Sequence, residues 1–335
     1  MLGGIALFVL LLTVLRDKIR GSLFAFSLFS MALSLLFMTS LRGWYITGHD
    51  IFLEYFVFQI TKAQGIWQMS NFQDPYTACL SITILPTIIS NITHINDLYI
   101  YKVIFQIIFS FSIVTTFIFI KRFVNPFFAF LGSFAIISLP TFMTDMPMLN
   151  RQEIALFFFA LLLYTLFSKF STKIKWILFF VFGIGLLLSH YSTTYISICL
   201  FIGGFLLYSV FRIFKLHPKL KYAIQSIDTK LGIVDNKQNL RLEIVVLLLI
   251  ATVFWNVNIT HTANGLMSTI NNITKDFKTL HFAKQKSDPG AYGLFSNKTP
   301  TPQALLDNYI ATTTQFVRKF NANSAFLDES IYTQY

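Results

Sequence analysis

Long apolar runs separated by short basic clusters restrict the fold of this chain more than any other feature. A transmembrane helix needs about 20 apolar residues, with roughly 17 to 25 tolerated. Only helices or closed barrels cross lipid, where no water satisfies the backbone, and continuous rather than alternating apolarity excludes the barrel. The sequence therefore predicts an all-α polytopic membrane protein with about eight transmembrane helices, at 1–15, 22–41, 97–120, 123–143, 152–168, 175–190, 194–214 and 242–260.

Composition supports this class and argues against a nucleic-acid-binding protein. Of the 335 residues, 55% are hydrophobic and 12% charged, whereas a soluble domain carries about 25% charged residues. The net charge of +11 does not form a basic stripe with interleaved aromatic side chains, as nucleic-acid binding requires. The cations lie instead where apolar runs end. We therefore expect membrane lipids, and no nucleic acid, as partners.

Basic residues gather in alternate loops. Four loops hold three, two, three and seven Lys or Arg residues, whereas the short loops between them hold only Arg42, Lys62 and Arg151. Such asymmetry places the basic loops in the cytoplasm. The first long loop (42–96) and the tail (261–335) then lie outside, so we predict a transmembrane domain (1–260) and an extracytoplasmic tail that begins a larger soluble domain. The basic loops contain Arg16, Lys18, Arg20, Lys121, Arg122, Lys169, Lys173, Lys175, Arg212, Lys215, Lys219, Lys221, Lys230, Lys237 and Arg241.

Two apolar segments of the first loop are too short to span a bilayer. Residues 51–64 are apolar enough for a membrane surface, and residues 78–90 form a run of 13 residues interrupted by Pro86. Such lengths are typical of interfacial or re-entrant segments. We predict that both segments lie along the outer membrane surface.

The stretch GHDIFLEY, just after the second predicted helix, holds the first candidate site. Asp50 and Glu54 are four residues apart and would share one face of a helix, where like charges repel unless a partner binds beside them. A carboxylate at this depth suits a general base, and a carboxylate pair suits a divalent cation that bridges to phosphate. We take Asp50 and Glu54 as catalytic candidates and His49 as a substrate-binding candidate. The alternative is a solvated loop helix.

The predicted outer turn between the fourth and fifth helices holds the second candidate site, with Asp145, Arg151 and Glu153. The guanidinium of Arg151 suits a phosphate clamp, which either acid could orient. The alternative is helix capping, because a carboxylate in a first helical turn is favoured by the helix dipole.

The outer turn between the sixth and seventh helices holds the third. His190 and Tyr191 stand there among several hydroxyl side chains, a composition that suits phosphate or sugar binding. The alternative is an interfacial histidine with ordinary hydrogen bonds. All three candidate clusters emerge on the same predicted side.

The chain has no phosphate-cradling glycine loop and no nucleophile elbow. An enzyme of the outer face without nucleotide machinery must use an activated donor already in the membrane. With acids in a long first outer loop and further polar residues in later outer turns, the chain resembles the GT-C class of integral-membrane glycosyltransferases. The strings GHDIFLEY, LNRQEIALFF and SHYSTTYI also resemble an uncharacterised family of predicted prokaryotic, largely archaeal, membrane proteins.

The resemblance implies a hexosyltransferase of the cell envelope that moves a sugar from a polyprenyl-phosphate donor to a glycan, lipid or protein acceptor at the outer face. Asp50 would be the general base, Glu54 would position the acceptor, and Arg151 and His190 would bind the carrier phosphate. No definite cofactor is implied, and a divalent cation is left open. The alternatives are a cell-surface polysaccharide polymerase or ligase, a lipid or small-molecule transporter, and a structural assembly subunit.

Overall fold

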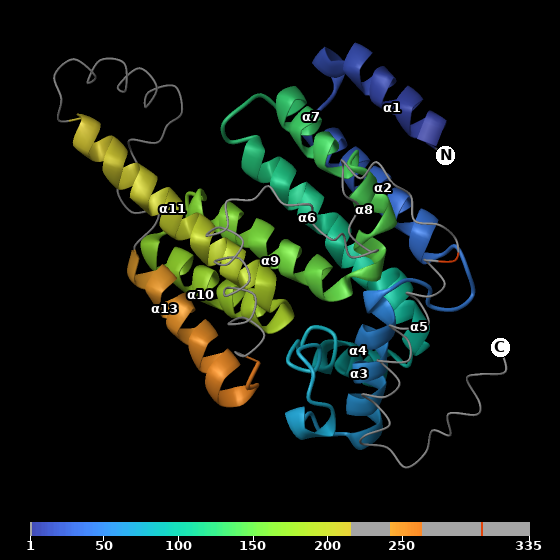
Figure 1. Cartoon of the computed structure of the whole chain (residues 1–335). Helices are drawn as coiled ribbons and strands as arrows, with labels where there is room; N and C mark the ends of the chain where they lie inside the picture. The colour runs from blue at the N-terminus through green and yellow to red at the C-terminus, as the bar shows by residue number, and fades with distance from the viewer. Residues whose placement is uncertain (1, 216–241, 263–302, 304–335) are drawn as a thin grey trace. The chain divides into compact units, whose positions relative to one another are not determined.

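The computed structural model describes residues 2–215 and 242–262, together with residue 303. Most of the predicted tail and of the fourth basic loop lies outside these residues. In the described part the chain is helical and has no strand (Figure 1). The elements are α1 (Leu2–Val14), η1 (Arg16–Lys18), α2 (Gly21–Ser40), α3 (Asp50–Gln64), η2 (Met69–Asn71), α4 (Ile84–Thr93), α5 (Asp97–Tyr99), η3 (Ile100–Ile104), α6 (Phe105–Ile120), α7 (Pro126–Ile137), α8 (Pro140–Thr144), η4 (Met146–Met148), α9 (Asn150–Leu166), α10 (Thr172–Ser189), α11 (Tyr191–Lys215), α13 (Leu242–Phe254) and η5 (Trp255–Ile259).

Three helical segments are long and apolar enough to cross a membrane: α2, α10 and the 24-residue run Asp97–Ile120 formed by α5, η3 and α6. At about 1.5 Å per residue this run is roughly 36 Å long, more than the ~30 Å hydrocarbon core. Each of the eight predicted segments contains a helix. The all-helical fold class is thus confirmed for the described residues, and at least three helices have the dimensions of membrane spans. Eight spans remain a prediction.

The predicted continuous helix at 123–143 is wrong in its extent. Helix α7 starts only at Pro126, which Asn125 precedes as a cap, and the chain bends by 64° between α7 and the segment Pro140–Met148. Pro140 lacks a backbone N–H and its ring disfavours helical geometry at the residue before it. Leu139 is accordingly extended. The bent pair would count as a fourth span if it crosses as one unit.

Helix α6 lies at the centre of the helical packing. It packs against α2 and α7 on one side and against α9 on the other, and α9 in turn packs against α10 (Figure 1). Buried aromatic and aliphatic side chains fill the first interface, among them Phe24, Phe117 and Phe130. A second cluster joins α9, α10, α11 and α13 through residues such as Leu162 and Phe179. The site described below lies where α3 meets the start of α9.

The first loop folds into two short helices, α3 and α4, neither of which has the length of a span. Gly65 ends α3 in the left-handed conformation that glycine adopts readily. Pro86 does not interrupt α4 as predicted. It lies in the first turn of that helix, where a missing N–H leaves no bond unmade. The phenol of Tyr101 in η3 donates to the carbonyl of Ile82 at 2.7 Å, and its oxygen lies 3.2 Å from the carbonyl of Glu54. Tyr101 thereby fastens this loop to the helical core.

Two predicted cytoplasmic loops contact each other through the carboxyl end of α9. Arg122 Nη1 donates to the carbonyl of Phe167 at 2.6 Å, and Lys175 Nζ donates to the carbonyl of Leu166 at 3.3 Å. The last carbonyls of a helix have no partner within the helix and favour cations. The first two of the three predicted outer clusters meet at the opposite end of α9.

Candidate functional site

Helix α3 carries the first pair of candidate residues at its amino end. The backbone N–H of Asp50 donates to His49 Nδ1 at 2.8 Å, so His49 caps the helix. Gly48 precedes it with a φ of 150°, a conformation that side chains rarely adopt. A Cβ at Gly48 would also meet Met148 Cγ at 2.7 Å. This glycine therefore allows the chain to approach the turn before α9 closely and to start α3 there.

Asp50 and Glu54 lie one helical turn apart, and both reach the same guanidinium. Arg151 Nη2 donates to Asp50 Oδ2 at 2.9 Å, and Arg151 Nε lies 3.4 Å from Glu54 Oε1. The repulsion expected between the two acids is thus offset by a cation from the first turn of α9. The sequence allowed a divalent cation to bind beside Asp50 and Glu54, and in the structure the Arg151 guanidinium lies at that position.

Tyr76 packs against the Arg151 guanidinium. This residue was not identified from the sequence. The Arg151 guanidinium carbon lies 3.7 Å from the centre of the Tyr76 ring, a cation–π distance. The Tyr76 phenol is hydrogen-bonded to Asp50. Burial raises the pKa of that phenol well above its usual range, so it stays protonated and donates to the carboxylate.

The two acids differ in exposure and in protonation. Asp50 exposes 31% of its side chain. Burial alone would raise the pKa of Asp50, but the Tyr76 hydrogen bond, the Arg151 charge and further hydrogen bonds outweigh it and lower that pKa. Glu54 is fully buried, and desolvation raises its pKa to about 7 despite the Arg151 charge. Asp50 is therefore the ionised and accessible carboxylate of the pair.

Glu54 is bound to the backbone of α9 rather than exposed to a substrate. Its Oε2 accepts the N–H of Asn150 at 2.9 Å, and its Oε1 accepts the N–H of Arg151 at 3.4 Å. Free N–H groups at a helix start attract carboxylates. Glu54 thus caps α9 from α3 and fixes the position of Arg151. This geometry indicates a positioning residue, in contrast with the direct acceptor contact expected from the sequence.

A buried polar cluster of Gln106, Asn150 and Glu153 adjoins Glu54, which accepts the N–H of Asn150. Gln106 Nε2 donates to Asn150 Oδ1 and to Glu153 Oε2, both at 3.2 Å. Gln106 Oε1, Asn150 Nδ2 and Glu153 Oε1 lack a hydrogen-bond partner within the described part of the chain. Glu153 lies in the first turn of α9, which agrees with the alternative interpretation of this turn as a helix cap. Gln106 was missed, although a lone amide inside an apolar run marks a functional or packing site.

His190 and Tyr191 lie near the first site. His190 is buried, its Nδ1 is 2.7 Å from Thr193 Oγ1, and its ring contacts Tyr191 with centroids 5.5 Å apart. The charges of Arg151 and Asp50 both act on His190. Ser81 Oγ in the first loop donates to the carbonyl of Ser189 at 3.5 Å. The structure thus brings the third predicted cluster to the same region as the first two.

Asp145 does not join the group. Its side chain is half-buried at the end of α8 and forms no hydrogen bond or ion pair within the described residues. Those residues also contain no group of three or more His, Cys, Asp or Glu side chains arranged to hold a metal ion. The site therefore consists of Asp50, Arg151, Tyr76 and Glu54, with His49, His190 and Tyr191 at its edge.

The chain was compared with known proteins in three ways. A scan against family models found no match, and searches of curated proteins and of solved structures found none either.

Proposed function

We propose that this chain is a multi-pass membrane glycosyltransferase of GT-C type that uses a polyprenyl-phosphate sugar donor at the outer membrane face. One observation carries the proposal. Asp50 is an ionised, partly exposed carboxylate held by fixed hydrogen-bond donors where α3 meets the start of α9. Its ionised state, fixed orientation and exposure allow it to accept a proton from an acceptor hydroxyl.

The proposed step is a single displacement at the anomeric carbon. The acceptor hydroxyl oxygen attacks the anomeric carbon of the donor sugar while its proton passes to Asp50. The bond between that carbon and the carrier phosphate breaks, and the electron pair leaves with the polyprenyl phosphate. The product has the inverted anomeric configuration. Asp50 then releases its proton to solvent.

Positioning is the role we assign to three neighbours of Asp50. Arg151 and Tyr76 are both hydrogen-bonded to its carboxylate, and Glu54 fixes Arg151 by accepting its backbone N–H at the start of α9. Among the guanidinium nitrogens of Arg151, Nη2 donates to Asp50 and Nε forms an ion pair with Glu54 at 3.4 Å, whereas Nη1 has no hydrogen-bond partner in the described part of the chain. We assign phosphate binding to His190 and Tyr191, whose region adjoins Asp50.

The test supplies the full chain, reconstituted in proteoliposomes, with a polyprenyl-phosphate hexose and acceptor lipids or glycans extracted from cell envelopes. Sugar transfer and release of polyprenyl phosphate are both measured. Asp50→Asn should insert and fold but lose about 10²–10⁴-fold in kcat, the usual contribution of a general base. Asp17→Asn, at a side chain that is 90% exposed in η1, is the matched control and should transfer normally. Near-normal turnover by Asp50→Asn would remove the assigned base.

A polysaccharide polymerase or ligase would use the same site and would differ in its product. Transfer of one sugar per acceptor supports the glycosyltransferase, whereas long or block products support the polymerase or ligase.

Proton-coupled transport is a second candidate, favoured by the buried cluster of Gln106, Asn150 and Glu153 with its unpartnered polar atoms. Buried ionisable groups between membrane helices are typical of proton pathways. Glu153→Gln should then abolish pH-driven flux of a lipid or small solute in the same proteoliposomes. Under the glycosyltransferase proposal the same variant should retain transfer.

A further inference from the structure

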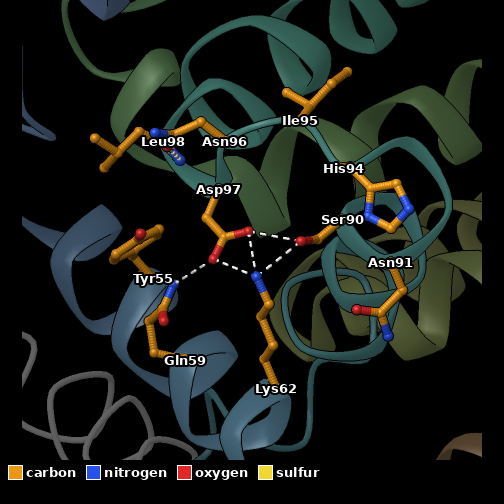
Figure 2. A pocket seen from close by; sticks show the side chains of 10 residues that line it. All are labelled: Tyr55, Gln59, Lys62, Ser90, Asn91, His94, Ile95, Asn96, Asp97 and Leu98. Carbon is orange, nitrogen blue, oxygen red and sulfur yellow. Dashed lines mark hydrogen bonds and ion pairs between the residues drawn. The ribbon is translucent and has the colours of Figure 1, made fainter.

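A pocket lies on the face of α3 that is turned away from Asp50 and Arg151. Its volume is about 840 Å³, and it lies between α3, α4 and the start of α5 (Figure 2). Tyr55, Gln59 and Lys62 contribute one wall from α3, because residues three and four apart share a helix face. Asn91 and His94 contribute the facing wall from the end of α4.

The charges in this pocket cancel each other. Lys62 Nζ donates to both carboxylate oxygens of Asp97 at 2.7 Å and to Ser90 Oγ at 2.9 Å. Ser90 Oγ and Gln59 Nε2 add further donors to Asp97, at 2.7 and 3.1 Å. Figure 2 shows this network at the centre of the lining residues. Lys62 has thus used its three donors within the protein, and it offers little to an incoming phosphate.

The remaining polar groups of the lining include no carboxylate, ammonium or guanidinium group. Asn96 Oδ1 accepts the N–H of Leu98, which leaves its amide Nδ2 available. The side chains of Asn91 and His94 form no hydrogen bond within the described residues. In Figure 2 Tyr55 and Gln59 lie on one side of the Lys62–Asp97 pair, and His94 and Asn91 on the other. The walls therefore combine amides, an imidazole and an aromatic ring around a neutralised ion pair.

We propose that this pocket binds the neutral sugar residues of a glycan acceptor, an inference that rests on the proposed function. Hydroxyl groups of a sugar both donate and accept hydrogen bonds, as amide and imidazole groups do. Tyr55 adds an apolar body with a polar tip. It lies five residues from Asp50 along α3, about 7.5 Å of helix rise and roughly 140° around the helix axis. An acceptor held in the pocket must therefore extend around α3 to present a hydroxyl to Asp50, which suits a glycan of several sugar residues.

The test measures binding alone, so that it does not depend on turnover. Detergent-solubilised full chain is applied to an array of neutral hexose and N-acetylhexosamine oligosaccharides, with sulfated and phosphorylated counterparts beside them. Ile95→Trp places a large side chain in the pocket without removing a hydrogen-bonding group. Ile92→Trp, in the last turn of α4 at a residue that is 74% exposed and outside the lining, is the matched control. Gln59→Leu removes a polar wall group.

The wild-type chain and Ile92→Trp should bind at least one neutral oligosaccharide. Ile95→Trp should weaken that binding about tenfold or more, and Gln59→Leu by a smaller factor, as the loss of one or two hydrogen bonds predicts. Asp17→Asn, at an exposed side chain outside the lining, should bind normally. Equal binding by Ile95→Trp, no neutral ligand at all, or a preference for the anionic glycans would overturn the proposal. Sugar binding by a wild-type chain that performs no transfer would instead overturn the proposed function and leave the pocket a sugar site.

Discussion

Arg151 Nη2 donates to Asp50 Oδ2 at 2.9 Å across 101 residues of sequence. The Arg151 side chain is only 9% exposed, whereas that of Asp50 is 31% exposed. The Arg151 guanidinium is thus buried in the protein, while the Asp50 carboxylate that it binds is partly exposed at the surface. This asymmetry is what a positioned base requires, because a buried donor network restricts the carboxylate without blocking access to it.

Arg151→Lys should lower kcat for transfer by about 100-fold, the usual cost of misplacing a reacting group by about 1 Å. An ammonium group is a point charge and does not replace a planar fork that faces Asp50 and Glu54 together. The KM for acceptor should change less than kcat. Arg122→Lys, at an exposed guanidinium near the other end of α9, is the matched control. Normal kcat in Arg151→Lys would show that its charge alone suffices.

Tyr76→Phe should shift the acid limb of the pH–kcat/KM profile to higher pH. The Tyr76 hydrogen bond helps to lower the pKa of Asp50, so its removal raises that pKa, and Asp50 is ionised only at higher pH. Activity should approach the wild-type value above the new limb. The phenylalanine ring can still pack under Arg151.

A purely structural role for Tyr76 would instead lower the whole profile without moving its limb. Tyr164→Phe, whose ring lies 5.1 Å from the Arg122 guanidinium carbon, is the control and should leave the limb unchanged.

Local patterns in the sequence predicted part of this site. Asp50 and Glu54 stand at a helical spacing, and the helix they form covers Asp50–Gln64. Arg151 and Glu153 mark a polar turn at the start of an apolar helix. These signals lie within a few residues of each other, where helical periodicity alone relates them.

Contacts between distant segments could not be predicted in this way. Tyr76 lies in a turn, where its N–H donates to Asp74 Oδ1 at 3.0 Å. Local bonds of this kind do not reveal that the Arg151 guanidinium lies over the Tyr76 ring. The burial of Glu54 likewise depends on where α9 packs. The break before Pro140 is a different case, because proline was visible in the sequence and its effect on Leu139 follows from local sterics.

Single cysteines should test the predicted topology. In a Cys199→Ser background, which removes the exposed native thiol, Asn71→Cys should react with a membrane-impermeant maleimide from outside intact cells. Lys18→Cys and Lys169→Cys should react only after the membrane is opened, because basic loops stay in the cytoplasm. The reverse pattern would place Asp50 inside and remove the outer-face donor from the proposal.

Glu54→Gln should flatten the pH dependence of stability. Burial raises the pKa of Glu54 from 4.5 to about 7, so the folded chain holds a proton that the unfolded chain has already released. The associated stability is fully present below pH 4.5 and is lost as the pH rises through about 7. The loss is on the order of 3 kcal/mol for a shift of this size.

The measurement is the Tm of purified protein in detergent at a series of pH values between 4.5 and 8. The wild-type Tm should fall as the pH rises, the Glu54→Gln curve should be flatter, and Asp17→Asn should follow the wild type. A Tm of Glu54→Gln that falls as steeply as that of the wild type would assign the effect to another group. Arg151 is paired with two acids, Asp50 and Glu54. Because glutamine cannot ionise, Glu54→Gln leaves Asp50 as the anionic partner of this pair. Transfer should therefore decline modestly in this variant, and far less than in Asp50→Asn.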